Sequence, residues 1–318
     1  MKITKSMIVL DYAIVIILLL LLVFFSVVAD YFFTVTTFLT ILRQVSITGI
    51  ISIGMAFVIL TGGIDLSVGS IAGVSSVTAA MLMMSGTPIY FACILTVLVA
   101  IGYGIFSGVL IAQFKMPPLI ATLGMMTALR GIAFIITDGL PVFGFSKTYG
   151  NFAKGTLFGI PLMVLLMMLV FLCAKFILDK TTLGRYVYGV GGNAEATRLS
   201  GISVTKMTIF VYALNGFLAG IAGLVLLSRT NSGQPSAGTG YEMDAITAVV
   251  LGGVSLSGGQ GKLSLVLVGV LIMGILSTGM LMCNINDYVQ QLVKGLVLLG
   301  AVAFSNLSQS LHIRLGNK

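Results

Sequence analysis

Asp65 is the acidic residue whose surroundings are the most informative about chemistry. It lies within Thr61–Ser70, between two apolar runs, and the chain has only nine acidic residues. An ionisable group between apolar segments is costly unless it faces protein, water or a partner charge. Flanking residues that carry a hydroxyl or no side chain include Thr61, Gly62, Gly63, Ser67 and Gly69. Two compatible interpretations follow. The segment is an interrupted helix that lines a pathway for a polar solute, or Asp65 caps the next helix by accepting hydrogen bonds from its first amides.

A second glycine-rich segment, Leu251–Gly261, also lies between two apolar runs. Matched interruptions of this kind are expected in a transporter built from two related halves, with broken helices near its pathway. Short glycine-rich strings also align by chance, so the similarity is only weak evidence for an internal repeat.

The segment 184–202 carries the strongest local pattern, because it contains the start and stop signals of a short helix. Asn193 is a good N-cap, Glu195 suits the first turn, Arg198 the last turn, and Gly201 the C-cap. The pattern predicts a short helix flanked by glycines and presented to a groove on another protein. The alternative is a connector that lies on the membrane surface.

Residues for other chemistry are missing from the sequence. The single histidine, His312, is near the C-terminus, and the three cysteines lie in apolar runs. No cluster has the spacing of metal ligands, and no nucleophile accompanies a base. We therefore expect no catalytic residue, no metal, no cofactor and no enzymatic activity.

Composition identifies the environment of these segments as a lipid bilayer. The chain of 318 residues is 58% hydrophobic and 8% charged, whereas soluble domains are about 25% charged. Spanning helices need about 20 apolar residues, and about ten runs qualify, which predicts an all-α membrane protein with broken helices. The runs are Ile8–Val28, Val45–Leu60, Ser67–Met84, Ile89–Ala112, Leu119–Ile136, Phe158–Leu178, Met207–Leu227, Met243–Leu256, Leu263–Met282 and Tyr288–Ser305.

The positions of the basic residues predict the orientation, since Lys and Arg accumulate on the cytoplasmic side. An N-terminus inside the cell and an even number of spans place both termini in the cytoplasm. The residues then on that side are Lys2, Lys5, Lys115, Lys175, Lys180, Arg185, Arg198, Lys206, Lys262, Arg314 and Lys318. The net charge of +8 is therefore a topology signal, and we expect no nucleic acid. The first apolar run resembles a secretory signal, but its length favours a retained helix.

The spacing of Glu195-Ala196 and Gly201-Ile202 resembles the EAA loop, the coupling helix of permease subunits of ATP-binding-cassette importers. The second Ala of that loop is Thr197 here, a mild departure. The strings Thr61–Ser70, Gly189–Ile202, Gly238–Ile246 and Val249–Gly261 are similar to those of ribose and related monosaccharide permeases. The resemblance runs from about Ile41 to Ser305 and implies one permease domain, 1–318, with a cytoplasmic coupling loop at 184–202.

The resemblance also implies partners and places for the motif residues. In that family two permease subunits form the pore, two ATPase subunits bind the coupling helices, and an extracytoplasmic binding protein delivers the sugar at the bacterial inner membrane. Asp65 and its neighbours are then expected near the pathway. The residues expected at the ATPase interface are Gly184, Arg185, Asn193, Glu195, Arg198 and Gly201. The second permease subunit is expected to be another copy of this chain.

One string resembles a site that we do not expect. Residues 256–260, Leu-Ser-Gly-Gly-Gln, spell the signature of the ATPase subunits themselves. A nucleotide site also needs the phosphate loop G-x-x-x-x-G-K-[ST]. Around Lys262 that loop would need Gly at 256 and Ser or Thr at 263, and both positions are Leu.

The expected function is therefore translocation of a monosaccharide by alternating access, driven by ATP hydrolysis in a separate subunit. The main alternative is an ion-coupled secondary sugar transporter, which needs intramembrane carboxylates or unwound carbonyls for its ion. A passive channel would need rings of polar groups along its pore, and a membrane-embedded enzyme would need a catalytic cluster.

Overall fold

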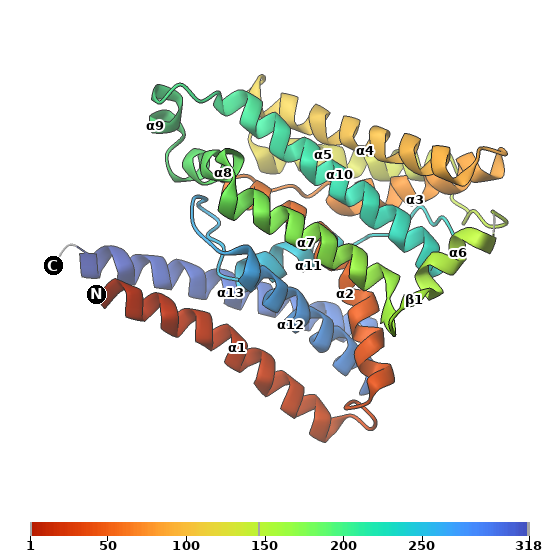
Figure 1. Ribbon diagram of the computed structural model, residues 1–318, viewed down its shortest axis with the longest axis horizontal. Helices are drawn as coiled ribbons and strands as arrows, with labels where there is room; N and C mark the ends of the chain where they lie inside the picture. The colour runs from red at the N-terminus through yellow and green to blue at the C-terminus, as the bar shows by residue number, and fades with distance from the viewer. Residues whose placement is uncertain (1, 146, 317–318) are drawn as a thin grey trace.

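The computed structural model describes residues 2–145 and 147–316, and the surroundings of side chains within 13–145 and 148–304. The side chains of Lys2, Lys5, His312, Arg314 and Lys318 lie outside the described residues. The elements, in chain order, are α1 (Lys2–Val28), α2 (Val35–Leu60), α3 (Val68–Met84), α4 (Ile89–Ala112), α5 (Pro118–Ile135), α6 (Lys147–Lys154), β1 (Thr156–Leu157), β2 (Ile160–Pro161), α7 (Leu162–Lys180), α8 (Thr182–Gly192), α9 (Ala194–Leu199), α10 (Val204–Thr230), α11 (Tyr241–Leu251), α12 (Leu263–Met282) and α13 (Asp287–Gly316). The two short strands pair antiparallel with each other. The fold is thus all-α apart from one small ribbon (Figure 1).

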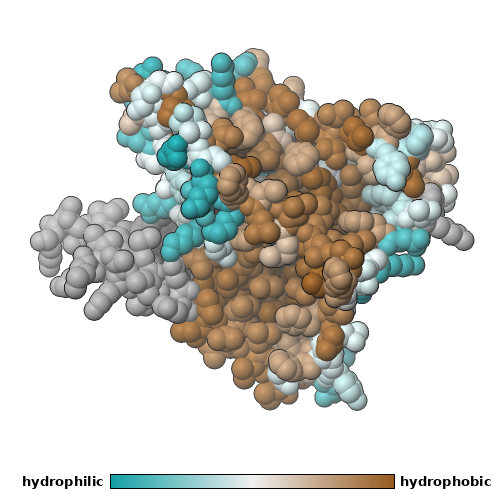
Figure 2. All heavy atoms as spheres, viewed as in Figure 1, coloured by the Kyte–Doolittle hydropathy of each residue, from teal (hydrophilic) through white to brown (hydrophobic). Residues whose placement is uncertain are grey.

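Several of these helices are long and apolar enough to cross a membrane. Seven qualify among the described residues: α2, α4, α5, α7, α10, α12 and α13. Two shorter apolar helices, Ala13–Val28 and Val68–Met84, add to them. A broad hydrophobic band runs across the molecule in Figure 2, and polar side chains gather on either side of it. The chain is therefore a multi-pass membrane protein.

The spans expected at Ile89–Ala112 and Leu263–Met282 have the same bounds in the structure. The expected start of the second span at Val45 is wrong, because α2 begins at Val35. Thr34 caps it, since its side-chain oxygen accepts a hydrogen bond from the amide of Thr37 at 3.2 Å. The first turns of α2 contain Thr, Arg and Gln, so a search for apolar runs does not detect this part of the helix.

Helix α10 lies at the centre of the bundle, against α2, α3 and α4. Its small residues let the backbones approach closely, as at helix contacts in other membrane proteins. A methyl group added to Gly216 would lie 2.5 Å from the carbonyl oxygen of Ala100 in α4. One added to Gly223 would collide with the carbonyl of Ala72 in α3. The position of α10 therefore fixes α4 and also α3, the helix that follows the first break.

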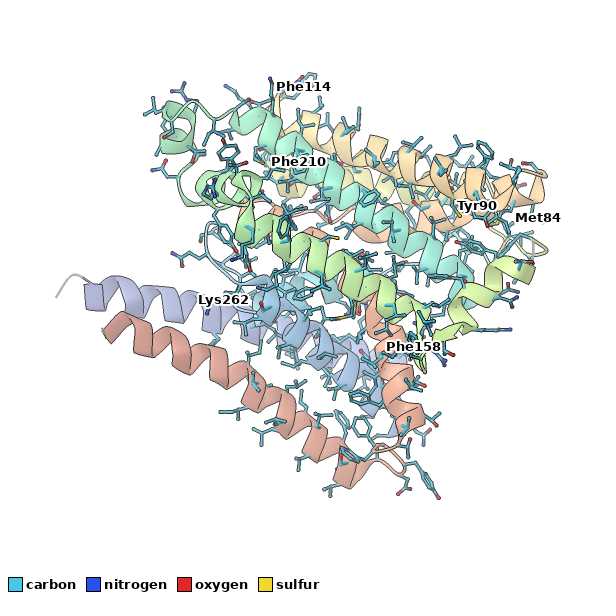
Figure 3. The ribbon with its side chains drawn as sticks, in the orientation of Figure 1. Met84, Tyr90, Phe114, Phe158, Phe210 and Lys262 are labelled. Atoms are coloured by element: carbon cyan, nitrogen blue, oxygen red, sulfur yellow. The ribbon has the colours of Figure 1, made fainter. Side chains whose placement is uncertain are left out.

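The helices run between two ends of the molecule, defined here by the short helices that mark them. The α8–α9 end also holds the first turn of α1 and the last turn of α13 (Figure 1). The opposite, α6 end holds α6 and the β1–β2 ribbon. Lys262 and Phe114 lie toward the α8–α9 end, and Met84, Tyr90 and Phe158 toward the α6 end (Figure 3). The loop before α12 and the turns at Tyr90 and Phe158 are thus at opposite ends.

Candidate functional site

Helix α2 ends at the first glycine-rich segment through a Schellman motif. The amide of Gly63 donates to the carbonyl of Val58 at 3.0 Å, and that of Gly62 donates to Ile59 at 2.9 Å. Gly62 has φ +81°, a left-handed conformation that glycine adopts without a steric penalty. This termination leaves the carbonyl of Leu60 in need of a donor from elsewhere.

The carboxylate of Asp65 organises the turn that follows. One oxygen accepts hydrogen bonds from the amide and the hydroxyl of Ser67, at 2.9 and 2.5 Å. The other accepts from the side-chain amide of Asn215 in α10, at 2.9 Å. Asp65 thus binds the first amide of the expected span Ser67–Met84, as the cap interpretation predicted. The helix itself begins one residue later, at Val68, and has no side-chain cap bond of its own.

Helices α5 and α10 cover this turn. Tyr212 and Thr122 each donate a hydroxyl hydrogen bond to the carbonyl of Ile64, at 3.3 Å. The side chains of Asp65 and Ser67 are 0% exposed, and Gly63 is also buried, while Thr61 is half-buried and Gly62 is exposed. In this conformation the exposed part of the predicted pathway segment is Thr61–Gly62, and Asp65 holds the turn behind it.

The second interruption has the same backbone design. Helix α11 ends with the amide of Val254 donating to Val249 at 3.2 Å and that of Gly253 donating to Val250 at 2.9 Å, again a Schellman motif. Gly253 has φ +74°. The loop that follows returns to the first break, because the amide of Gly259 donates to the carbonyl of Leu60 at 2.9 Å. The donor that Leu60 needs thus comes from the other glycine-rich segment.

The predicted short helix exists as α9, and its caps agree with the sequence. The side chain of Asn193 accepts a hydrogen bond from the amide of Ala196 at 2.9 Å. Gly201 ends the helix with φ +84°. Glu195 and Arg198 pair through two hydrogen bonds, of 2.6 and 2.9 Å. Arg198 holds the pKa of the Glu195 carboxyl below its usual value, so both groups are charged at neutral pH.

Glycines flank α9 on both sides, as predicted, but those on its N-terminal side belong to a helix that the sequence analysis did not expect. Gly189, Gly191 and Gly192 form the last turn of α8. The side chain of Thr181 caps α8 by accepting from the amide of Gly184 at 3.4 Å. Residues 184–202 are therefore two helices separated by Asn193.

The residues expected at an ATPase interface differ in their access. Arg185, Asn193, Glu195, Arg198 and Gly201 are exposed. Gly184 is buried, and a methyl group added there would collide with the carbonyl of Leu178 in α7. Gly184 therefore joins α8 to α7 and is not available to a partner.

The sequence analysis gave no structural role to three residues of this region, of which it named only Thr197. Leu199 is 73% exposed at the end of α9, a large apolar side chain on a polar surface. Thr197 is buried, and its hydroxyl donates to the carbonyl of Asn193 at 2.8 Å. Tyr188 in α8 donates its hydroxyl to the carbonyl of Gly261 at 2.9 Å. Leu199, an apolar residue at the end of a polar helix, is the one that the sequence pattern could have revealed.

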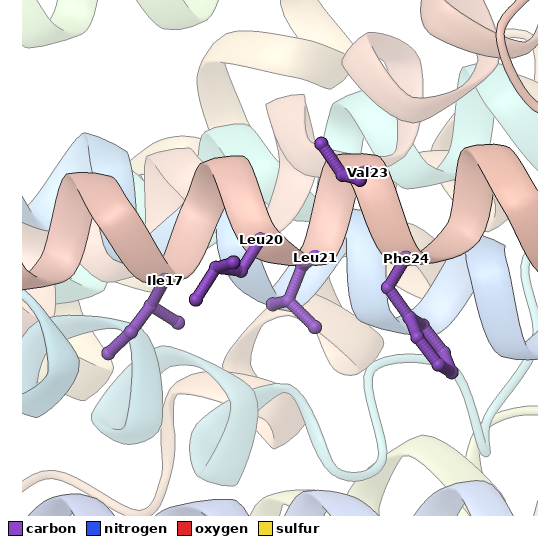
Figure 4. A pocket seen from close by; sticks show the side chains of 5 residues that line it. All are labelled: Ile17, Leu20, Leu21, Val23 and Phe24. Carbon is purple, nitrogen blue, oxygen red and sulfur yellow. The ribbon is translucent and has the colours of Figure 1, made fainter.

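Two hollows in the described surface lie away from both breaks. One of about 480 Å³ is lined only by Ile17, Leu20, Leu21, Val23 and Phe24 of α1 (Figure 4). It offers no hydrogen-bonding side chain to a polar solute, so it suits hydrocarbon. No group of three His, Cys, Asp or Glu side chains in the described part of the chain could hold a metal ion.

Comparisons with known proteins give the family. The model of the family described as "Branched-chain amino acid transport system / permease component" matches residues 37–302. The ribose import permease of Haemophilus influenzae is 46% identical over 279 residues, 86% of each chain. That of Bacillus subtilis is 46% identical over 83% of each. The L-arabinose transport system permease of Escherichia coli K12 is 37% identical over 83% of this chain and 81% of its own. No solved structure matches. With the family model covering most of the chain and both breaks and the capped α9 lying within the match, the chain belongs to this family of transport-system permease components.

Proposed function

We propose that this chain is the translocation subunit of an ATP-binding-cassette importer for a monosaccharide such as ribose, and that a separate subunit hydrolyses the ATP. The observation that carries the proposal is α9, a capped and exposed helix outside the membrane-spanning bundle. Its charged pair and the exposed Leu199 suit a groove on a soluble partner. The names of the relatives, which import ribose or transport L-arabinose, support the sugar.

The proposed topology has ten crossings, with both termini and the coupling loop 184–202 in the cytoplasm of a bacterial cell. The seven long spans supply seven of these crossings. The other three are α1, α3, and the half-helix α11 together with its loop. The α8–α9 end then faces the cytoplasm, in agreement with the positive-inside rule. Lys115, Lys180, Arg185, Lys206 and Lys262 adjoin the helix ends or short helices on that side.

The proposed pathway passes the exposed face of the first break, Thr61–Gly62, with Gly63, Asp65 and Ser67 shaping the turn behind it. A monosaccharide has many hydroxyls and no charge, so it needs hydrogen-bonding groups rather than an ion pair. Backbone amides and carbonyls at interrupted helices supply such groups. A second copy of the chain completes the pore, and an extracytoplasmic binding protein delivers the sugar at the α6 end.

The first test is reconstitution of the chain in lipid with its ATPase and binding protein, followed by measurement of ATP hydrolysis across a panel of monosaccharides. We expect a sugar to stimulate hydrolysis. Replacing Glu195 and Arg198 by Ala together should lower ATPase affinity by about tenfold or more, as for other interface anchors.

The matched control is the double replacement of Lys175 and Asp179 by Ala. These residues also form an exposed ion pair within one helix near the α8–α9 end, at 2.5 Å, but they lie on α7. Their loss should leave ATPase affinity unchanged. Equal effects of the two double variants would show that α9 does not contact the ATPase. Sugar uptake by the chain alone under an ion gradient, with no ATPase bound, would identify a secondary transporter instead.

A further inference from the structure

Three chain segments that are far apart in sequence meet backbone to backbone next to the first break. They are the end of α2 (Leu60–Gly63), the last turn of α8 (Tyr188–Gly192) and the loop before α12 (Ser257–Lys262). We refer to them together as the glycine junction. Its contacts are made almost entirely by glycine, which permits backbones to approach more closely than any other residue does.

Gly191 is the residue of α8 that touches both the end of α2 and the loop before α12. A methyl group added there would overlap the carbonyl oxygen of Leu60 and lie 2.5 Å from the amide nitrogen of Gly259. That carbonyl and that amide are themselves hydrogen-bonded at 2.9 Å. Gly191 therefore packs directly over the bond that joins the two interrupted segments.

The other contacts of the junction are equally close. A methyl group on Gly258 would lie 2.8 Å from the amide nitrogen of Gly62 and 2.9 Å from the Cα of Gly191. The hydroxyl of Tyr188 adds a hydrogen bond to the carbonyl of Gly261 at 2.9 Å. Together these contacts connect α8 to the segment that begins α12.

Helix α8 is also tied to α9. A methyl group on Gly189 would lie 3.2 Å from the hydroxyl oxygen of the buried Thr197. Thr197 in turn holds the carbonyl of Asn193 between the two helices. A displacement of α9 is therefore transmitted to α8 through atoms that are in contact.

We propose that Gly191 and Tyr188 are positioning residues that transmit movement of the docking helix α9 to both interrupted segments at once. The inference rests on the proposed function, since it assumes that an ATPase moves α9. Close-packed protein interiors transmit strain because they have few voids to absorb it. Backbone contacts also lack the rotatable side chain that could take up a small shift. Moving α8 must then move the end of α2 and the start of α12 together.

The test uses the full importer, with the unmodified chain, its ATPase and its binding protein in proteoliposomes. Gly191→Ala and Tyr188→Phe are compared with two matched controls in α8. A methyl group on Gly192 meets nothing within 4 Å, so Gly192→Ala controls for the helix. Tyr186→Phe controls for loss of a tyrosine hydroxyl. The measurements are ATPase affinity and the amount of sugar transported per ATP hydrolysed.

We expect all four variants to keep the ATPase affinity of the unmodified chain. The sugar transported per ATP should fall about fivefold or more in Gly191→Ala, the lower end of coupling between linked sites, and less in Tyr188→Phe. The two controls should match the unmodified chain. Tyr188→Phe removes only one hydroxyl, so it tests the idea even if Gly191→Ala fails to fold.

Two results would overturn the inference. One is an unchanged transport ratio in Tyr188→Phe, together with an unchanged ratio in any folded Gly191→Ala. The other is a fall in the ratio that is equally large in the Gly192→Ala and Tyr186→Phe controls. Failure of the unmodified chain to bind the ATPase would instead overturn the proposed function, and the inference with it.

Discussion

At the scale of single residues, the buried carboxylate of Asp65 has a structural role that its hydrogen bonds define. Ser67 and Asn215 supply three donors to its two oxygens. The side-chain oxygen of Asn215 is buried and has no hydrogen-bond partner in the described structure. If the Asn215 amide turned over, this oxygen would face residue 65 in place of the nitrogen, and the oxygen itself would give up no hydrogen bond. Asp65 thus has a partner that tolerates a neutral amide in place of the carboxylate.

This property makes the consequence of Asp65→Asn predictable. The variant should fold and transport close to the unmodified level, because its oxygen still accepts from Ser67 and a turned Asn215 accepts from its new amide. Asp65→Ala should lower stability, by about 1–3 kcal/mol for each donor left unsatisfied. Thermal unfolding and sugar uptake measure the two effects. Folded Asp65→Asn protein without transport would show that the charge itself acts in the pathway.

At the scale of elements, α9 is a six-residue helix that depends on its caps. Isolated helices of this length are marginal in water. Asn193 supplies one cap bond, and Thr197 is the residue through which α9 packs on α8. The rest of α9 is exposed, so the helix contributes little to the stability of the whole protein.

Asn193→Ala should therefore weaken the ATPase complex without lowering the unfolding temperature. Loss of an N-cap costs about 0.5–2 kcal/mol. A docking helix that is formed less often binds with an affinity reduced by the same fraction. Titration of the ATPase against the variant in lipid should show about two- to thirtyfold weaker binding. Asn193→Asp, which keeps a side-chain acceptor, is the control and should bind normally.

At the scale of the whole molecule, the last span is attached mainly through one neighbour. Helix α13 packs chiefly against α11. Lys294 of α13 and Asp244 of α11 form an ion pair of 2.8 Å, with 26% and 16% of their side chains exposed. Charges at such depth are costly unless they are paired, so the pair fixes where α13 lies on the bundle.

Removing one member of the pair should cost more than removing both. Lys294→Met leaves Asp244 charged and alone, and should lower stability by roughly 2 kcal/mol, below the 3–5 kcal/mol of fully buried pairs. The double variant Asp244→Asn and Lys294→Met should recover most of that loss. The measurement is the unfolding temperature in detergent of the single and the double variant, each compared with the unmodified chain. Additive losses in the double variant would mean that the two charges do not stabilise α13 together.

Local signals in the sequence account for most of the elements. Apolar runs located α4 and α12 to the residue, and the Asn193 and Gly201 caps located α9. The start of α2 was missed because Thr34 and the polar first turns conceal it from hydropathy. The burial of Gly184 was missed because it depends on α7, an element that 184–202 does not contain.

The sequence by itself determined that this is a helical membrane protein, where its two glycine-rich breaks lie, and that it carries a short capped helix. These properties depend on hydropathy and on caps, which act over a few neighbouring residues. Only the tertiary structure decided that Asn215 binds Asp65, 150 positions away, and that Gly259 binds Leu60. Which backbones meet depends on how α10 packs against its neighbours and on how the second loop returns to α8. Packing of that kind is a property of the whole bundle, so no local pattern records it.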